Sequence, residues 1–307
     1  MKDIERILVI KLGALGDFVQ ALGPMKAIRD HHPDACITLL TTKPYADLGV
    51  ASGLVDRVWI DSKPKISQPS KIFDLWRTLH GGRFDQVYDL QTSDRSSFYF
   101  RLMGRRAAWS GIATGCSQPH DNPRRNDMHT IERQAEQLHK AGIENVPFPD
   151  LSWAATDLDP TAFGLKGDYA LLVPGGAAHR PAKRWSIKNY GILARALAER
   201  GLTPAILGTE IERETAWKIT GACPQAVSLI GKTDFLQIAG LARRAKLAVG
   251  NDSGPMHLIT IAGTPSLVLY SHASDPALCA QRGPKVEILR RPSLADLTLE
   301  EVLEALP

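Results

Sequence analysis

The segment Asn251–His257 brings together backbone and side-chain groups that can hold an anion. It follows the apolar run Leu247–Val249 and precedes a second apolar run, 258–262, an order that predicts a strand, a tight turn and a helix. Pro255 suits the first helical position, where its missing N–H would be unpaired anyway. Free N–H groups at a helix start attract phosphate, and His257 adds a donor one turn later. A capped helix with a surface histidine is the structural alternative, but this concentration of anion-binding groups favours a phosphate site.

A second small-residue turn follows the first apolar run of the chain, residues 7–10. Gly13 and Gly16 allow the backbone to turn tightly and a ligand to approach closely. Asp17 then begins a helical pattern, and with Gln20 it forms a capping-box pattern, the more frequent role for such an aspartate on local sequence. A catalytic role at the end of a strand is compatible with that cap.

Gly175 and Gly176 follow the apolar run 169–173, and a cluster of cations comes next. A glycine turn exposes N–H groups, and neighbouring cations suit a diphosphate. A solvated basic loop ahead of a helix explains the same pattern equally well. The cations of this cluster are His179, Arg180, Lys183 and Arg184.

A further turn, after the apolar run 204–207, begins at Gly208 and carries Glu210, Glu212 and Glu214. Acidic residues in the first turn of a helix usually complement its dipole. A carboxylate after a strand can also bind the two hydroxyls of a ribose. The residue types by themselves favour the structural role for these glutamates.

The elements that must position these residues follow from the alternation of short apolar runs with helical patterns, which is typical of a parallel sheet flanked by helices. Residues 145–167 hold three prolines and little periodicity, which predicts a linker. We therefore expect two doubly wound α/β domains, 1–150 and 168–290, that face a ligand-binding cleft. Strands are predicted at 6–10, 36–41, 56–60, 86–90, 169–173, 204–207, 227–229, 246–249 and 266–270, and the clearest helix at 187–200.

Two irregular stretches lie within the first predicted domain. Pro24 falls inside the helical pattern that follows Asp17, and it should kink or split that helix because it removes a backbone hydrogen bond. Residues 95–133 show poor periodicity, which predicts loops and short helices. Their arginines could form a basic face for an acidic acceptor or an anionic lipid, although solvated surface side chains are the more frequent case. They are Arg101, Arg105, Arg106, Arg124 and Arg125.

The composition sets limits on the class of protein. The chain has 307 residues, too many for one ordinary core, and its net charge of +4 allows an acidic ligand or an anionic membrane surface without demanding either. No apolar run approaches the ~20 residues that span a bilayer, and the N-terminus does not resemble a secretory signal. Four widely spaced cysteines predict neither a zinc site nor a disulfide framework, so a reducing cytoplasm is the simplest compartment. No pattern predicts nucleic-acid binding.

Taken together in their order and spacing, these segments resemble the heptosyltransferase family, glycosyltransferase family 9. The resemblance implies a GT-B architecture, with two Rossmann-like domains and the sugar nucleotide bound mainly by the C-terminal one. It also implies that the C-terminal helix, within 291–307, packs back on the first domain. The segments that carry it are Gly16-Asp17, Asp89-Leu90-Gln91, Lys183-Arg184-Trp185, 208–214, Gly231-Lys232-Thr233, Asn251–His257 and Gly263-Thr264-Pro265.

The resemblance implies a role for each matching residue. Asp17 matches the general base of an inverting transfer, and Lys183 the lysine that contacts the diphosphate and stabilises departing ADP. Glu212 matches the acid that holds the ribose, and Thr233 the residue beside the adenine. The other donor contacts expected are Gly175, Gly176, Asp252, Ser253, Gly254 and His257, and the acceptor side includes Gly16 and Gln91.

This chain departs from the family pattern at two places. Ser186 stands where the family commonly has proline, and residues 177–181 lack the serine or threonine expected beside a phosphate. The implied reaction moves heptose from ADP-heptose to a lipopolysaccharide core acceptor at the inner face of the cytoplasmic membrane. The residues offer no convincing set of metal ligands, so we expect no metal or other cofactor. A non-catalytic nucleotide-sugar-binding protein and another GT-B enzyme, such as a nucleotide-sugar epimerase, are the alternatives. The missing dinucleotide glycines disfavour a dehydrogenase.

Overall fold

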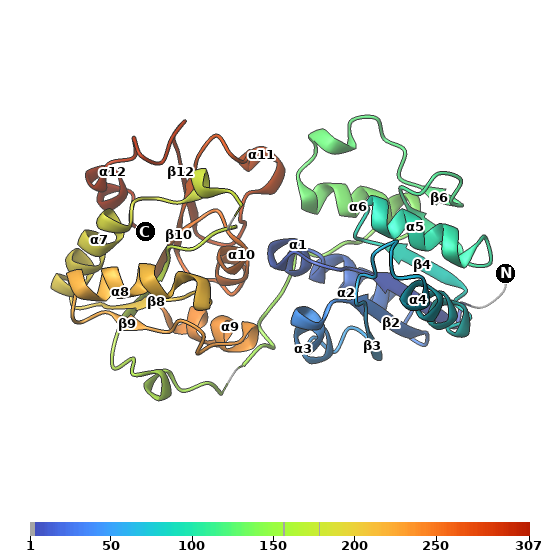
Figure 1. Cartoon of the computed structure of the whole chain (residues 1–307), viewed down its shortest axis with the longest axis horizontal. Coiled ribbons are helices and arrows are strands. Elements are labelled where there is room, and N and C mark those ends of the chain that lie inside the picture. Colours follow the sequence, from blue (N-terminus) through green and yellow to red (C-terminus); the bar gives the residue numbers. More distant parts are fainter. Residues whose placement is uncertain (1–3, 156, 178) are drawn as a thin grey trace. The chain divides into compact units, whose positions relative to one another are not determined.

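The computed structural model describes residues 4–155, 157–177 and 179–307. They form two compact units, one that ends at Pro149 and one that runs from Asp150 to Pro307. The division falls inside the segment 145–167 whose composition predicts a linker. Each unit is a sheet with helices packed on it, as Figure 1 shows.

The first unit is built on parallel strands in the order β3-β2-β1-β4-β5-β6. Its strands are β1 Arg6–Ile10, β2 Cys36–Thr41, β3 Arg57–Ile60, β4 Gln86–Asp89, β5 Ala108–Gly111 and β6 Gln118–Pro119. Its helices are α1 Leu15–Gln20, α2 Leu22–His31, α3 Lys43–Ala51, α4 Pro69–Gly81, α5 Asp94–Met103, η1 Arg125–Asp127 and α6 Thr130–Lys140.

The second unit repeats this topology, with parallel strands in the order β9-β8-β7-β10-β11-β12. Its strands are β7 Tyr169–Val173, β8 Thr203–Ile206, β9 Val227–Ser228, β10 Leu247–Asn251, β11 Ser266–Tyr270 and β12 Val286–Arg290. Its helices are η2 Pro160–Phe163, η3 Pro181–Lys183, α7 Ile187–Glu199, η4 Glu210–Glu212, α8 Arg213–Ala222, α9 Phe235–Arg244, α10 Gly254–Ile261, α11 Pro276–Cys279 and α12 Leu299–Glu304.

The central strands are mostly apolar and buried because helices cover both faces of each sheet. Ile7, Leu8, Val9 and Ile10 of β1 are fully buried, and all five residues of β7 are buried. Trp109 packs into the core of the first unit, and Trp185 and Tyr190 into that of the second. Such continuous burial explains why these strands appear in the sequence as short unbroken apolar runs and not as alternating patterns.

Each strand predicted from the sequence is present, with ends shifted by two residues at most. Strands β5, β6 and β12 were not predicted. β5 and β6 are short and contain serine, glycine, glutamine and proline, residues that are uncommon in strands. β12 is an edge strand in which Glu287 and Arg290 are exposed, so its sequence lacks a buried run.

The helix that contains Asp17 differs from the capping-box interpretation. It begins earlier, with Ala14 as the N-cap, and Asp17 is its third residue. Because no side chain accepts a cap hydrogen bond there, the cap formed by Asp17 and Gln20 is wrong. The predicted split of this helix is confirmed, but it falls at Ala21, between α1 and α2, and Pro24 is the third residue of α2.

The C-terminal helix also differs from expectation. Leu297 and Val302 belong to the core of the second unit, and α12 packs on α7. The Trp185 indole N–H donates to the Leu297 carbonyl at 2.9 Å. The structure therefore places residues 291–307 on the second unit, because their apolar side chains complete the core around Trp185. Among the described helices, none has the length and apolarity needed to cross a membrane.

Candidate active site

The two sheets share a feature that determines where a site can form. In each, the chain reverses its direction of winding between two central strands, β1 and β4 in the first unit and β7 and β10 in the second. Loops that leave the carboxyl ends of such strands diverge, and the space between them is the usual ligand site of an open α/β sheet. The glycine turns and the Asn251–His257 segment all follow these four strands or their neighbours.

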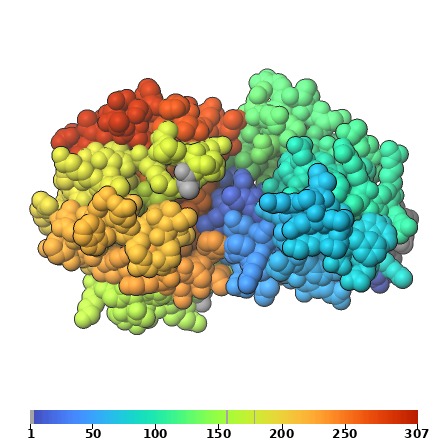
Figure 2. All heavy atoms as spheres, in the orientation of Figure 1, coloured from blue at the N-terminus to red at the C-terminus, as the bar shows by residue number. Residues whose placement is uncertain are grey.

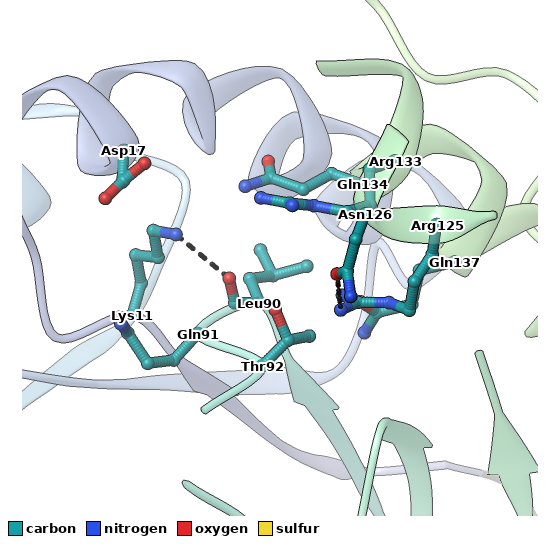
Figure 3. A pocket seen from close by; sticks show the side chains of 10 residues that line it. All are labelled: Lys11, Asp17, Leu90, Gln91, Thr92, Arg125, Asn126, Arg133, Gln134 and Gln137. Carbon is teal, nitrogen blue, oxygen red and sulfur yellow. Dashed lines mark hydrogen bonds between the residues drawn. The ribbon is translucent and has the colours of Figure 1, made fainter. Parts of the chain in front are cut away.

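In the first unit a polar cavity of about 190 Å³ opens at this point. Figure 3 shows that its side chains come from the loops after β1 and β4, from α1, and from the η1–α6 region. The residues that line it are Lys11, Asp17, Leu90, Gln91, Thr92, Arg125, Asn126, Arg133, Gln134 and Gln137.

Asp17 projects into this cavity from the first turn of α1 and is exposed. Gly13 makes the preceding loop feasible, because its φ is +113° and a Cβ atom there would lie 2.5 Å from the Tyr45 ring. Burial, with the Asp17 carboxylate, raises the pKa of the Tyr45 phenol. Gly16, the expected acceptor contact, is buried within α1 and does not line the cavity.

Lys11 is a site residue that the sequence reasoning missed. It is buried, its ammonium group donates to the Leu90 carbonyl at 2.9 Å, and it points into the cavity. Burial lowers the pKa of Lys11, while the carboxylates of Asp17 and Asp89 oppose that shift. The available signal was a lysine that directly continues the apolar run of β1, a position where an unpaired charge is costly.

Asp89 holds the turn after β4, and Gln91 ties that turn to the end of β1. The Gln91 side-chain oxygen accepts the Leu12 N–H at 2.8 Å. One Asp89 oxygen accepts the N–H groups of Gln91 and Thr92 at 3.1 and 3.0 Å. Asp89 is fully buried, and burial raises its pKa to about 6 against the opposing effect of those hydrogen bonds. Gln91 thus lines the cavity and also holds the loop that leads into α1, where Asp17 lies.

Two arginines face the same cavity from the η1–α6 region. Burial lowers the pKa of Arg125, and the charge of Arg133 lowers it further. Within the described residues, Arg125 Nη2 is buried without a hydrogen-bond partner. The expected basic face is therefore not one surface: Arg125 turns into the cavity, whereas Arg101, Arg105, Arg106 and Arg124 are exposed. Two guanidinium groups that repel each other in one cavity have the chemistry to bind an anion.

In the second unit, Asn251 joins three segments at the end of β10. Its amide N–H group donates to the carbonyls of Pro174 and Gly175 at 2.7 and 3.2 Å. Its oxygen accepts the Trp185 N–H and the Tyr190 hydroxyl, both at 3.1 Å. Asn251 is fully buried. One side chain therefore fixes the glycine turn after β7 and the segment that carries Lys183.

Lys183 and Asp252 form an ion pair in which both side chains are largely buried. Asp252 also accepts the Ser274 hydroxyl at 2.6 Å and the Gln281 amide at 3.0 Å. Burial alone would raise the pKa of Asp252, but the hydrogen bonds from Lys183, Ser274 and Gln281 outweigh it and lower the pKa. The sequence reasoning missed Ser274 and Gln281, which follow β11 and carry no local motif.

Glu212 lies where two glycines leave room for it. A Cβ atom on Gly175 would lie 3.1 Å from the Glu212 side chain, and one on Gly208 would lie 3.0 Å from it. One Glu212 oxygen accepts the Thr209 N–H and hydroxyl at 2.9 and 2.8 Å. The glutamate therefore completes a capping box with Thr209, which is the structural role that its residue type predicts. Its close approach to the Gly175 turn brings the carboxylate to the same edge of the sheet.

The remaining predicted donor residues lie at or near this edge. Helix α10 begins at Gly254, one residue before the predicted start, with Ser253 as its N-cap. The Ser253 hydroxyl makes no cap bond and, among the described residues, is buried without a partner. His257 is buried one turn into the helix, and Thr233 lies in the loop before α9.

Comparison with known proteins agrees with this geometry. The model of glycosyltransferase family 9 (heptosyltransferase) matches residues 72–301. The chain belongs to glycosyltransferase family 9. It is a glycosyl-transferring enzyme. The alternative of a non-catalytic nucleotide-sugar-binding protein is therefore not supported.

Individual relatives extend the match along almost the whole chain. A lipopolysaccharide core heptosyltransferase of Haemophilus influenzae is 24% identical over 87% of this chain and 79% of its own length. Lipopolysaccharide heptosyltransferase 2 of Salmonella typhimurium is 29% identical over 98% of this chain and 97% of its own. The solved structure of an Escherichia coli ADP-heptose lipopolysaccharide heptosyltransferase II superposes with a TM-score of 0.82 at 22% identity, covering 97% and 96% of the two chains. The GT-B fold of these heptosyltransferases is thus the fold of this chain.

The raised pKa of Asp89 predicts a pH-dependent stability of this glycosyltransferase. Between pH 4 and 6 the folded state holds the proton more tightly than the unfolded state, so the free energy of unfolding falls as the pH rises. The Asp89→Asn variant lacks this titration. We expect its stability relative to the native chain to improve by about 2–3 kcal/mol from pH 4 to pH 7. Urea unfolding followed by tryptophan fluorescence measures the difference, and parallel curves for the two proteins would contradict it.

The hydrogen bonds of Asn251 predict a second effect on stability. Asn251→Asp keeps the shape but replaces two donors with a carboxylate facing the Pro174 and Gly175 carbonyls. We expect the free energy of unfolding at pH 7 to fall by about 2–4 kcal/mol. Asn189→Asp, on α7 in the same unit and outside the network, is the matched control and should change it by less than about 0.5 kcal/mol. Equal stability of the two variants would show that Asn251 does not hold these segments.

Proposed function

We propose that this enzyme transfers heptose from ADP-heptose to a lipopolysaccharide core acceptor, with inversion at the anomeric carbon and with Asp17 as the general base. The family match carries the proposal. The names of two relatives specify lipopolysaccharide core and ADP-heptose as their substrates. Because the proposed acceptor is lipid-linked, the proposed reaction takes place at a membrane, and the family resemblance assigns it to the inner face of the cytoplasmic membrane.

The first unit is proposed to prepare the acceptor. The acceptor hydroxyl lies beside Asp17, which takes its proton as the oxygen attacks the anomeric carbon. The new carbon–oxygen bond forms as the bond to the diphosphate breaks, and the electron pair leaves with ADP. Asp17 suits this role because its carboxylate is exposed to the cavity and is not engaged in a helix cap.

The second unit is proposed to hold the donor. Lys183 and the N–H groups at Ser253–Gly254 take up the charge that develops on ADP, without a metal ion. The Lys183–Asp252 ion pair supports this, because Asp252 holds the ammonium group in place and is itself held by Ser274 and Gln281. Glu212 is assigned to the ribose and Thr233 to the adenine. Gly175, Gly176 and His257 complete the donor contacts.

The charge of the first-unit cavity supports an anionic acceptor. Arg125 and Arg133 face it together, and the repulsion between them falls when a carboxylate or phosphate binds both. We assign this pair to an acidic group of the acceptor sugar, close to the hydroxyl that reacts.

The transfer itself is tested with ADP-heptose and a heptose-free core acceptor, with ADP release as the readout. Asp17→Asn should lower kcat by about 10²–10⁴ while the affinity for ADP, measured by calorimetry, stays unchanged. Asp34→Asn, at an exposed position, is the matched control and should keep native turnover. Near-native turnover of the Asp17→Asn variant would contradict the assignment of Asp17 as the general base. ADP release that needs no acceptor would favour an epimerase-like enzyme instead.

The arginine pair has its own test. Arg133→Met should raise the KM for the acceptor by about 10–100-fold and leave the KM for ADP-heptose unchanged, since only acceptor contacts are lost. Arg133→Lys should recover part of the affinity. Arg124→Met, an exposed arginine outside the cavity, is the control. An unchanged acceptor KM for Arg133→Met would overturn the assignment.

A further inference from the structure

Lys11 is a buried cation that the proposed chemistry does not use. It directly follows the apolar strand β1, and it is only 3% exposed. Among the described residues it is the only buried lysine or arginine. In Figure 2 little of the dark blue N-terminal segment is visible on the face shown, where light blue to green segments form most of the first unit. Lysine is almost never buried unless its charge is paired, so its place at the site needs an explanation.

Lys11 is held in place by both its backbone and its side chain. The backbone N–H donates to the Leu40 carbonyl at 3.0 Å. The ammonium group donates to the Leu90 carbonyl at 2.9 Å, in the turn that follows β4. The next residue, Leu12, is tied to the same turn by its N–H bond to the Gln91 side chain at 2.8 Å. An ammonium group has three N–H donors, so two remain after the bond that anchors it to Leu90.

The ammonium group of Lys11 also faces the cavity that holds Asp17. Both residues line this cavity, and Figure 3 shows the Lys11 side chain extending into it. Burial lowers the pKa of Lys11, and the largest opposing effect is the charge of Asp17, followed by that of Asp89. Asp17 itself is exposed and is not engaged in a helix cap. A fixed cation therefore lies within electrostatic reach of the exposed carboxylate that is proposed as the general base.

An acidic acceptor creates a need for this cation. An acidic group bound by Arg125 and Arg133 brings a negative charge into the cavity and neutralises the arginine pair. A like charge favours the protonated form of a nearby carboxylate, and a protonated Asp17 cannot take the proton of the acceptor hydroxyl. Among the described residues that line the cavity, Lys11 is the remaining lysine or arginine. Its charge compensates that of Asp17 while the arginines are occupied.

We propose that Lys11 is a positioning residue of the transfer. Its fixed ammonium group keeps the Asp17 carboxylate ionised and directed at the acceptor hydroxyl while Arg125 and Arg133 hold the acidic group of the acceptor. This role rests on the proposed function, because it needs Asp17 as the general base. A purely structural lysine would only tie the turn after β4 to the end of β1, and for that purpose the hydrogen bond to the Leu90 carbonyl would suffice.

The test is the pH dependence of kcat at saturating ADP-heptose and acceptor, because kcat reports the groups that titrate in the enzyme–substrate complex. Lys11→Gln removes the charge but keeps an N–H that can donate to the Leu90 carbonyl. Without the cation Asp17 is protonated more easily, so the acidic limb, where kcat falls as the pH is lowered, should move to higher pH by about one unit. Lys11→Met, a second neutral variant, should shift the limb in the same direction. Lys11→Arg keeps the charge and should keep the native limb.

Two controls isolate the effect on Asp17. Lys26→Gln, on α2 of the same unit, removes a lysine that is paired with Asp30 and does not line the cavity, and it should keep the native limb. Asp89 also faces Lys11, and burial raises its pKa to about 6, so the Lys11→Gln comparison is repeated on an Asp89→Asn background, where the shift should persist. The other groups near Lys11 and Asp17 keep their charge between about pH 4 and 8, and they are Tyr45, Arg125 and Arg133. Circular dichroism checks that each variant is folded.

An acidic limb that stays at the native pH in both neutral variants would overturn the role of Lys11. An equal shift in Lys11→Arg would also overturn it, because the effect would then come from packing and not from charge. The proposed function fails in a different way, since Asp17→Asn would then keep near-native turnover. Loss of turnover in Asp17→Asn together with an unshifted limb in Lys11→Gln would contradict the role of Lys11 alone.

Discussion

In each unit one amide side chain joins the loops that follow the two central strands, and the site residues depend on that connection. Gln91 accepts the Leu12 N–H and so couples the end of β4 to the end of β1. Asn251 donates to the Pro174 and Gly175 carbonyls and couples the end of β10 to that of β7. The loops that leave these paired strands diverge, so no ladder hydrogen bonds hold the loops together. An amide supplies donors and an acceptor there without the cost of burying a charge.

Charged groups lie next to these amides, and Lys11 and Asp252 are compensated by their neighbours. Lys11 lies between Asp17 and Asp89 and donates to a carbonyl, while Asp252 receives hydrogen bonds from Lys183, Ser274 and Gln281. Buried charges are stable only when they are paired and hydrogen-bonded, so these clusters constrain the loops that carry them. The compensation is incomplete at Arg125, whose buried Nη2 has no partner among the described residues. The part of the site left open is thus the part that suits an anion.

Much of the fold was accessible from the sequence because its central strands are buried on both faces. Runs such as Ile7–Ile10 and Tyr169–Val173 are apolar without interruption, and glycine turns follow them. The strands at the edges of the two sheets could not be predicted from the sequence. β12 has exposed charged residues, and β6 is two residues long, so each is recognisable only through pairing with a neighbour. The capping box predicted at Asp17 is absent because α1 begins at Leu15, with Ala14 as its N-cap, ahead of the local cap signal.

The sequence by itself determined the organisation into two α/β units and the turns that carry Asp17, Gly175, Glu212 and Asn251–His257. Those features depend on local residue types and periodicity, which the chain displays directly. Only the tertiary structure decided that Lys11, Arg125 and Arg133 share a cavity with Asp17, that Ser274 and Gln281 hold Asp252, and that residues 291–307 complete the core around Trp185. These contacts join residues far apart in the chain, and their partners are set by strand order and packing, which no local pattern encodes.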